Sequence, residues 1–104
     1  MSSFKNVEVT KSANIYFDGK VVSYSVNLGN NEVKTLGVMQ VGEYEFSTND
    51  AEIMDILNGE LELTLPDATE TMTIKGGESF EVPANSKFKV NVKSVTDYCC
   101  HYIT

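Results

Sequence analysis

Apolar and polar residues alternate along much of this chain, in short runs separated by turn-forming residues. The run ELELTLP at 60–66 has its leucines on one face and polar residues on the other. In KFKVNV at 87–92, Phe88, Val90 and Val92 alternate with polar residues in the same way. This period of two residues is that of a β-strand with one buried face, whereas helical patterns are weak throughout.

Turn residues divide the alternating runs at regular intervals. Asp18-Gly19 and Asn58-Gly59 are hairpin signatures, Gly29-Asn30-Asn31 forms a further turn cluster, and Gly76-Gly77 ends another run. The only helix candidate, at 49–52, reads better as a turn. Roughly eight to ten short strands separated in this way predict an all-β sandwich or barrel.

The length and composition are those of one globular domain. The chain has 104 residues, of which 41% are apolar and 22% charged. No apolar run approaches the ~18 residues that span a bilayer. The N-terminal MSSFKNVEVTKS also lacks the basic-then-apolar pattern of a signal peptide. We therefore expect a cytoplasmic protein without a membrane partner.

The charge balance excludes whole classes of partner. The net charge is −7, and the basic residues are eight lysines and one histidine, without a single arginine. Nucleic-acid binding by phosphate neutralisation needs a basic face, which this composition does not provide. A single small anion remains possible, because one local pocket can oppose the overall field.

The two cysteines, Cys99 and Cys100, are neighbours in sequence. On a strand their side chains would point to opposite faces, which makes a mutual disulfide geometrically poor. Neither has the ligand spacing of a zinc site. We expect two reduced thiols, one pointing inward and one outward.

The stretch GEYEFSTNDAEIMDILNG at 42–59 resembles the first cupin motif, G-x5-H-x-H-x3,4-E-x6-G. Six residues separate Glu52 from Gly59, as the motif requires, and its two histidine positions fall on Phe46 and Thr48. Gly42 lies closer to these positions than the motif asks.

The second cupin motif, G-x5-P-x-G-x2-H-x3-N, resembles the stretch that begins Gly77-x5-Pro83, with Asn85 at the next glycine and Phe88 at the histidine position. The resemblance implies a cupin-like (RmlC-like) jelly-roll β-barrel. Of the metal ligands only Glu52 is kept, whereas oxygenase-type sites need two histidines and a carboxylate. We therefore expect no metal.

A closer resemblance is to the small cupin-fold pyrimidine/purine nucleoside phosphorylases. It rests on YFDGKV at 16–21, TLGVMQVGEYEFST at 35–48, GELELTLPDAT at 59–69, GGESFEVPANSKFKV at 76–90 and YCCHYI at 98–103. The likeness begins at residue 15. We therefore expect a barrel domain at 15–104 and a variable leader at 1–14.

This resemblance implies phosphorolysis, in which a nucleoside and inorganic phosphate give a free base and α-D-pentose 1-phosphate. It implies broad specificity that covers uridine, cytidine, thymidine, adenosine, guanosine, inosine and xanthosine. It further implies that no metal or organic cofactor takes part, with inorganic phosphate as the co-substrate.

Cleavage of a glycosidic bond passes through a cation-like sugar, so a phosphate seat, stabilisation of the sugar and a proton donor for the base would help. Phe46, Thr48 and Glu52 should converge inside the barrel because they occupy former ligand positions. We expect Glu52 and Thr48 to be catalytic, with Glu52 bonding the ribose hydroxyls or stabilising positive charge. Tyr44 could stack on the base.

Without arginine, the phosphate must be held by other donors. Thr35, Gly37 and Met39 share one face of a strand, and a glycine there lets a ligand approach the backbone. Lys34 starts on the opposite face. The residues expected to bind substrate are Tyr44, Ser47, Thr35, Gly37, Met39, Phe46, Phe88, Lys34 and His101.

Simpler interpretations compete at several positions. Glu52 could be a turn carboxylate, while Phe46, Phe88 and Met39 could fill the core of the barrel. His101 reads more readily as a core or interface histidine than as a catalytic one. The tyrosines at 16, 98 and 102 read most simply as wall residues.

Two other functions remain open on the sequence alone. One is a non-catalytic cupin-like module that binds a sugar or nucleoside, and the other is a metal-dependent cupin with ligands from unusual places. The outward apolar residues Leu36, Val38, Ile53 and Leu57 predict a homodimer, since two-fold pairing is the commonest closed assembly.

Overall fold

The computed structural model describes residues 3–103, which form one curled sheet of nine strands. The elements are β1 (Glu8–Val9), β2 (Asn14–Tyr16), the 3₁₀ turn η1 (Phe17–Gly19), β3 (Val21–Gly29), β4 (Glu32–Met39), β5 (Gly42–Ser47), β6 (Ala51–Thr64), β7 (Met72–Lys75), β8 (Ser79–Val82) and β9 (Lys87–Ile103). The all-β, single-domain prediction is confirmed.

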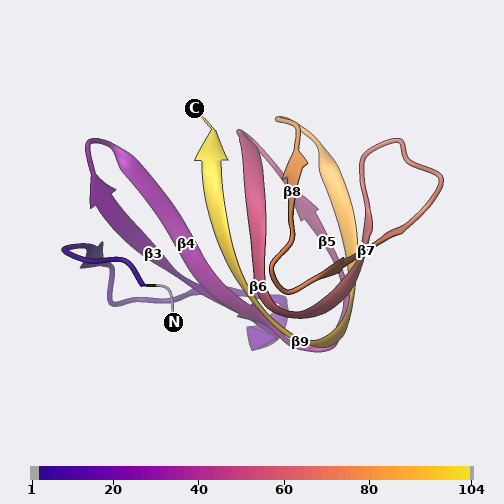
Figure 1. The fold of residues 1–104 in the computed structure, drawn as a ribbon, viewed down its shortest axis with the longest axis horizontal. Helices are drawn as coiled ribbons and strands as arrows, with labels where there is room; N and C mark the ends of the chain where they lie inside the picture. The colour runs from indigo at the N-terminus through magenta and orange to yellow at the C-terminus, as the bar shows by residue number, and fades with distance from the viewer. Residues whose placement is uncertain (1–2, 104) are drawn as a thin grey trace.

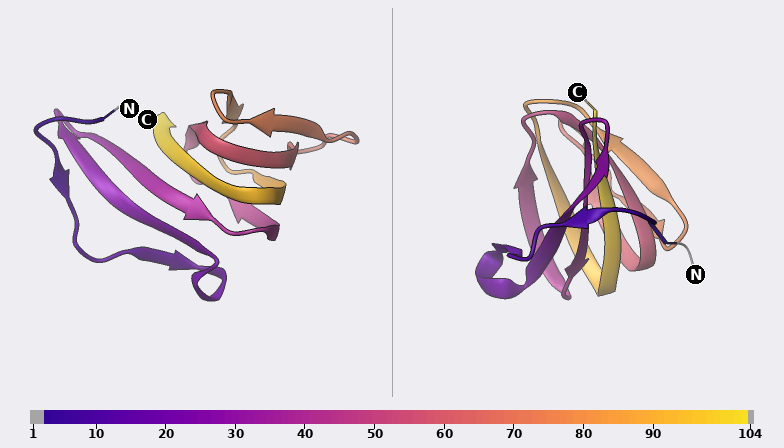
Figure 2. Two further views of the ribbon diagram at one scale, coloured as in Figure 1. Left: turned by 60° about the horizontal axis from the view of Figure 1, so that its bottom comes forward. Right: turned by 90° about the vertical axis from the view of Figure 1, so that its left-hand side faces the viewer.

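The strand order is β1-β3-β4-β9-β6-β7, with β2 on β3, β5 on β9 and β8 on β6. The sheet curls because the long strands β6 and β9 bend together, so that the two halves of each face one another across the interior (Figures 1 and 2). In residues 3–103 no helix is long and apolar enough to cross a membrane.

The bend in β6 corrects one sequence prediction. Asn58-Gly59 is not a hairpin turn, because β6 continues through it and the register with β9 shifts between Ile56 and Glu60. Gly59 has φ +102°, and a Cβ there would lie 2.5 Å from the Thr96 Oγ1. Glycine is needed both for the dihedral and for this close approach, so the signal for a turn instead marks a bulge.

The other turn predictions are confirmed, except at 49–52. Asn49 and Asp50 form a bend there, but Ala51 and Glu52 already belong to β6, so Glu52 is a strand residue and not a turn carboxylate. η1 joins β2 to β3 at Asp18-Gly19, and Asn30 and Asn31, both with positive φ, connect β3 to β4. That geometry matches a two-residue hairpin turn, which asparagine tolerates well.

The apolar core lies where the strands around the lower bend of the roll meet. Leu61, Leu63 and Val92 are fully buried, and Phe88 and Val90 are each 2% exposed. This confirms the predicted inward faces of 60–66 and 87–92. Alternation with a period of two therefore sets which side of each strand builds the core.

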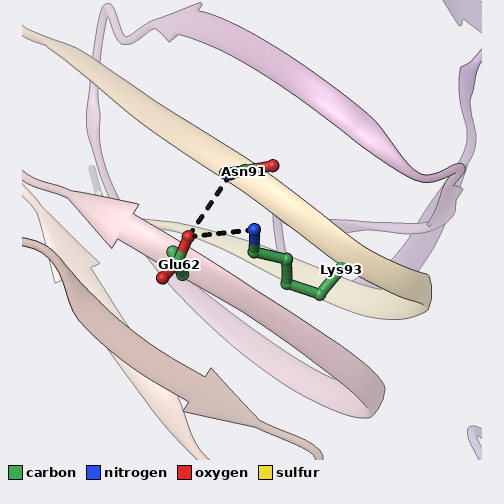
Figure 3. Close-up of polar contacts among 3 residues, drawn as sticks. All are labelled: Glu62, Asn91 and Lys93. Atoms are coloured by element: carbon green, nitrogen blue, oxygen red, sulfur yellow. Dashed lines mark hydrogen bonds and ion pairs between the residues drawn. The ribbon is translucent and has the colours of Figure 1, made fainter.

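The opposite side of the same strands is polar, as the alternation predicts. Asn91 donates a hydrogen bond from Nδ2 to Glu62 Oε1 at 3.3 Å, and Lys93 Nζ lies 3.3 Å from the same oxygen (Figure 3). Such an exposed ion pair adds little stability, but it keeps this face solvated.

A second outward region is apolar. Leu36, Val38 and Leu57 line a shallow groove, called here the outer groove, with Val38 38% and Leu57 47% exposed. Ile53 is half-buried on the same side of the sheet. The predicted apolar outer face is therefore present.

The N-terminal residues are tied to the edge of the sheet. Glu8 and Val9 pair with Asn27 and Val26, while β2 pairs with β3. Within the predicted leader, Met1 and Ser2 lie outside the described residues, and the boundary between 14 and 15 stays a prediction.

Candidate functional site

The upper part of the roll holds a half-open cavity of about 310 Å³. Its lining comes from β2, β3, β4, β5, β6 and β9, and it lies near the start of β6 and the end of β9, two segments that run side by side in Figure 1. Its lining residues are Tyr16, Ser23, Thr35, Phe46, Ser47, Thr48, Asn49, Asp50, Glu52, Met54, Phe88, Tyr98, Cys100 and Tyr102. This cavity is called the inner pocket below, and its size is typical of small-molecule sites, which run from ~300 to ~1,000 Å³.

Strand register explains how distant residues meet in the inner pocket. Cys100 on β9 stands between Thr35 on β4 and Met54 on β6, and Tyr102 stands opposite Glu52. Directly opposed residues point to the same face of a sheet. In the second half of β9, Tyr98, Cys100 and Tyr102 therefore all reach the pocket.

Glu52 is the half-buried acid of the site. Burial raises the pKa of its carboxyl above the ordinary value, while a hydrogen bond with the Cys100 thiol lowers it again in part. A carboxyl in such an environment holds its proton to higher pH than an exposed one, which suits a general acid.

The neighbouring thiol and phenol stay neutral. Burial, followed by the nearby Glu52 carboxylate, raises the pKa of Cys100 to about 12. Burial also raises the pKa of Tyr102 to about 12. A thiol this weakly acidic is no nucleophile at neutral pH, because the thiolate is the reactive form.

One side of the inner pocket is aromatic. Phe46 and Phe88 stack with their ring centroids 5.4 Å apart and their planes at 28°. Phe17 packs edge-on against Phe46 from η1, with centroids 5.5 Å apart. Because Phe88 is only 2% exposed and stacked on Phe46, the half-buried Phe46 is the ring that can accept the face of a ligand ring, and it offers no hydrogen-bonding group that would select among rings.

Thr48 lines the inner pocket, yet its hydroxyl is engaged elsewhere. It donates to the Pro83 carbonyl at 2.7 Å and accepts from the Ser86 amide at 3.0 Å. A threonine hydroxyl has one hydrogen to donate. Thr48 therefore joins the end of β5 to the loop before β9, and this use of its hydrogen gives no support to the predicted catalytic role.

The inner pocket brings together six of the residues expected from the sequence. They are Thr35, Phe46, Ser47, Thr48, Glu52 and Phe88. The convergence of Phe46, Thr48 and Glu52 is as expected, and the chemical roles of all six stay predictions.

Three predicted residues lie beside the inner pocket without lining it. Tyr44 is buried against Phe17, and its hydroxyl donates to the Gln40 carbonyl at 2.8 Å. Met39 is fully buried in the core. Gly37 faces inward as expected, but the ring of Tyr98 covers it.

Lys34 and His101 lie on the outer side of the sheet, where they are cross-strand partners. The Lys34 ammonium stands 5.5 Å from the centre of the Phe4 ring. His101 has a buried Nδ1 without a hydrogen-bond partner among residues 3–103. Their outward position follows from the alternation of side chains along a strand, because each is next in sequence to an inward-facing residue.

Motif spacing and alternation did not point to the other eight lining residues, which are Tyr16, Ser23, Asn49, Asp50, Met54, Tyr98, Cys100 and Tyr102. The tyrosines were interpreted as wall residues, and they do form the wall that faces the cavity. The alternation along YCCHYI could have identified Tyr98 and Tyr102 as lining residues, because they stand two positions on either side of the inward Cys100.

The charge of the inner pocket is unusual for an anion site. Asp50 and Glu52 supply its ionisable acids, and none of the described lining residues is a lysine, arginine or histidine. Across residues 3–103, histidine, cysteine, aspartate and glutamate form no group of three able to hold a metal ion. Hydroxyl groups are therefore the main donors that the described lining offers.

Comparison with known proteins places this geometry in a family. The family model for pyrimidine/purine nucleoside phosphorylase matches residues 11–102. A protein of that name from Geotalea uraniireducens (strain Rf4) is 54% identical over 103 residues, covering 99% of both chains. Another, from Sulfurovum sp. (strain NBC37-1), is 56% identical over 103 residues, covering 99% of this chain and 100% of the relative.

Solved structures share the fold of this chain. A protein of unknown function from Acinetobacter sp. ADP1 superposes with a TM-score of 0.94 at 38% identity, covering 97% of this chain and 98% of that one. An RmlC-like cupin from Shewanella frigidimarina NCIMB 400 superposes with a TM-score of 0.70 at 14% identity, over 97% and 86% of the chains, which confirms the cupin fold alone. The chain belongs to the pyrimidine/purine nucleoside phosphorylase family.

Proposed function

We propose that this protein is a nucleoside phosphorylase that works in the inner pocket. The observation that carries the proposal is the full-length similarity, at 54–56% identity, to relatives named pyrimidine/purine nucleoside phosphorylase. In the reaction the bond between C1′ and the base nitrogen breaks, a bond from C1′ to a phosphate oxygen forms, and the base leaves with a proton.

Glu52 is the proposed proton donor to the departing base. Its raised pKa, caused chiefly by burial, keeps more of the carboxyl protonated near neutral pH. When the proton passes to the base, the carboxylate left behind can stabilise the positive charge that develops on the sugar. This assigns Glu52 a definite step and leaves Thr48 to shape the pocket.

The aromatic wall is the proposed seat of the base. Stacking on Phe46, which Phe88 supports from behind, depends on the flat face that purines and pyrimidines share. This supports the broad set of uridine, cytidine, thymidine, adenosine, guanosine, inosine and xanthosine as substrates. The bond between the base and the sugar then lies beside Glu52, which can reach the departing base.

A direct assay tests the proposal. Purified protein is incubated with uridine or inosine, with and without inorganic phosphate, and free base and pentose 1-phosphate are measured. Base released only in the presence of phosphate is the expected result. Equal release without phosphate, or none with it, would contradict phosphorolysis.

The same assay tests the proposal that no metal or organic cofactor is required. Activity is measured after dialysis against EDTA, and the metal content of the protein is determined. Unchanged activity is expected, whereas a loss that added metal restores would favour a metal-dependent cupin enzyme.

The proposed assembly is a cytoplasmic homodimer formed through the outer groove. Val38 and Leu57 are exposed there, next to the half-buried Leu36 and Ile53. Covering apolar side chains of this kind with a second copy removes them from water. Light scattering at micromolar concentration should give twice the chain mass, and the mass of a single chain would contradict the dimer.

The electrostatics also favour a second candidate, a module that binds a nucleoside without turning it over. No cation is present among the described residues of the pocket wall to hold phosphate. A binder would show thermal stabilisation by nucleosides without release of base, and a ligand present at 100 times its Kd would add ~2.7 kcal/mol. Release of base that depends on phosphate would exclude this candidate.

A further inference from the structure

Three inward residues form a row across adjacent strands of the inner pocket. Ser23 on β3 stands directly opposite Gly37 on β4, and Gly37 stands directly opposite Tyr98 on β9. Neighbouring strands lie ~4.8 Å apart, so a tyrosine lying across the middle strand can bring its hydroxyl to the third. Gly37 is the residue that makes room for it.

The contact at Gly37 is close. A Cβ at this position would lie 2.6 Å from Tyr98 Cζ and 2.7 Å from Tyr98 Oη. Contacts this short do not occur, so a side chain at Gly37 would have to push the phenol ring away. The absence of a side chain at Gly37 therefore lets the Tyr98 ring lie across β4 and lets its hydroxyl reach toward β3.

Hydrogen bonds along the row have a direction. Asn14 Nδ2 donates to Ser23 Oγ at 3.3 Å, which leaves the Ser23 hydroxyl hydrogen available to the phenol oxygen. Burial raises the pKa of Tyr98, and the weaker effect of a hydrogen bond with Ser23 lowers it. A phenol that accepts from Ser23 keeps its own hydrogen for a group in the pocket, and such chains of donors strengthen one another.

The row lies on the side of the pocket where an anion is repelled least. The ionisable acids come from β6 and the residues just before it, Asp50 and Glu52, whereas Ser23 and Gly37 come from β3 and β4. In the strand order, β4 and β9 separate β3 from β6. Since like charges repel strongly in a poorly solvated site, phosphate is favoured toward the hydroxyl side.

We propose that Tyr98, held across Gly37 and oriented by Ser23, donates its hydroxyl hydrogen to inorganic phosphate and is the centre of a phosphate seat built from neutral groups. This rests on the proposed phosphorylase function. Hydrogen bonds from neutral hydroxyls to an anion are charge-assisted and stronger than those between neutral groups. Gly37 is a positioning residue, because it acts only through the ring of Tyr98.

Two substitutions test the seat. Tyr98→Phe keeps the ring and removes the donor, so the KM for inorganic phosphate should rise about 10- to 100-fold, the range expected for losing a hydrogen bond to a charged group. The KM for inosine should change less than about threefold. Tyr24→Phe is the matched control, because Tyr24 lines the outer groove at 44% exposure, away from the inner pocket, and the substitution keeps the ring that lies there, so neither constant should change.

Gly37→Ala should raise the KM for phosphate in the same way, because its Cβ displaces the ring. In a chain that already carries Tyr98→Phe, the same Gly37→Ala change should add less than about twofold, since the donor is already gone. Full additivity of the two changes would show that Gly37 acts by another route. Thermal unfolding reports whether each variant is folded, and Tyr98→Phe alone suffices if Gly37→Ala is not.

³¹P NMR, with and without inosine, measures the binding of inorganic phosphate. This measurement distinguishes failure of the phosphate seat from failure of the proposed function. If the wild type binds phosphate but releases no base, the proposed function fails, and weaker phosphate binding by Tyr98→Phe still supports the seat. The inference is overturned if Tyr98→Phe binds phosphate as tightly as the wild type. It is equally overturned if the wild type does not bind phosphate, or if the substitution weakens inosine binding alone.

Discussion

The two halves of β9 share one strand and one alternation but line different interiors. In the first half, Val90 and Val92 face a closed core of apolar side chains, and Phe88 lies both in that core and on the wall of the inner pocket. In the second half, Tyr98 and Cys100 pack against the same core and line the inner pocket. The backbone is regular in both, so the change from core to pocket lies in the inward side chains.

What separates the halves physically is which side chains the neighbouring strand β6 places beside them. Next to Val92 and Val90, β6 adds Leu61 and Leu63, which are fully buried and extend the apolar core. Higher up, β6 offers Glu52 and Met54, and a cavity of about 310 Å³ remains. We therefore expect substitutions of residues that line the inner pocket to reduce activity with little change in stability. Substitutions in the closed core should reduce stability with little change in activity.

The largest effect is expected at Glu52. Glu52→Gln removes the proton donor for the leaving base, so kcat for inosine should fall ~10²- to 10⁴-fold, as expected for loss of a general acid. Steady-state kinetics with inosine and phosphate measure this. Urea unfolding at pH 7 should show that the variant is no less stable than the wild type, since a buried charge has been removed.

A substrate that needs no acid is the control for this role. With 4-nitrophenyl β-D-ribofuranoside, whose leaving group departs without protonation, Glu52→Gln should lose far less activity than with inosine. An equal loss on both substrates would mean that Glu52 positions the sugar rather than protonating the base.

A core substitution tests the lower half. Val92→Ala should destabilise the protein by roughly 2–3 kcal/mol, because it removes two buried methyl groups and leaves a cavity. Urea unfolding measures the loss. Val95→Ala, on the same strand at a side chain that is 52% exposed, should change stability by less than about 0.5 kcal/mol.

Kinetics on the folded Val92→Ala protein complete the comparison. KM for inosine and for phosphate should match those of the wild type, because Val92 does not line the inner pocket. A large change in either KM would show that the two halves of β9 are coupled through the bend.

Alternation in the sequence predicted most of the fold, because neighbouring side chains of a strand point to opposite faces wherever the strand lies in the sheet. The inward faces of 60–66 and 87–92 and the outward position of Lys34 all follow from it. Asn58-Gly59 misled because the same dipeptide suits a hairpin turn and a bulge, and only the pairing of β6 with β9 distinguishes them.

The site was harder to predict, because its composition depends on which strands become neighbours. The cupin motif spacing brought Phe46, Thr48 and Glu52 into the expected interior. Tyr98 is different, since its place follows from a glycine 61 positions earlier that lies opposite it on β4. Likewise, the backbone groups of Pro83 and Ser86 that engage the Thr48 hydroxyl meet it only in the folded chain.

A smaller effect is expected at Thr48, which lies between β5 and β6 and is bonded to the loop before β9. Thr48→Val keeps the shape of the side chain but leaves the Ser86 amide and the Pro83 carbonyl without this partner, which should cost ~1–3 kcal/mol of stability. Thermal or urea unfolding measures this cost, and Thr48→Ser, which restores the hydroxyl, should recover most of it. If kcat of a folded Thr48→Val protein instead fell by more than about 100-fold, Thr48 would take part in the chemical step.

The smallest effect is a pH dependence of stability that stems from Glu52. Its pKa is raised in the folded protein, mainly by burial, so the unfolded chain releases this proton at lower pH than the folded one. The resulting loss of stability is absent below the ordinary pKa of 4.5, grows as the pH rises through the raised value, and is complete above it. The Glu52→Gln variant has no carboxyl at this position and does not lose stability in this way. Its stability relative to the wild type should therefore increase from pH 4 to pH 8, as urea unfolding at each pH can measure. A difference that stays constant over this range would mean that the carboxyl is as well solvated in the pocket as in the unfolded chain, and the assignment of Glu52 as the acid would then lose its physical basis.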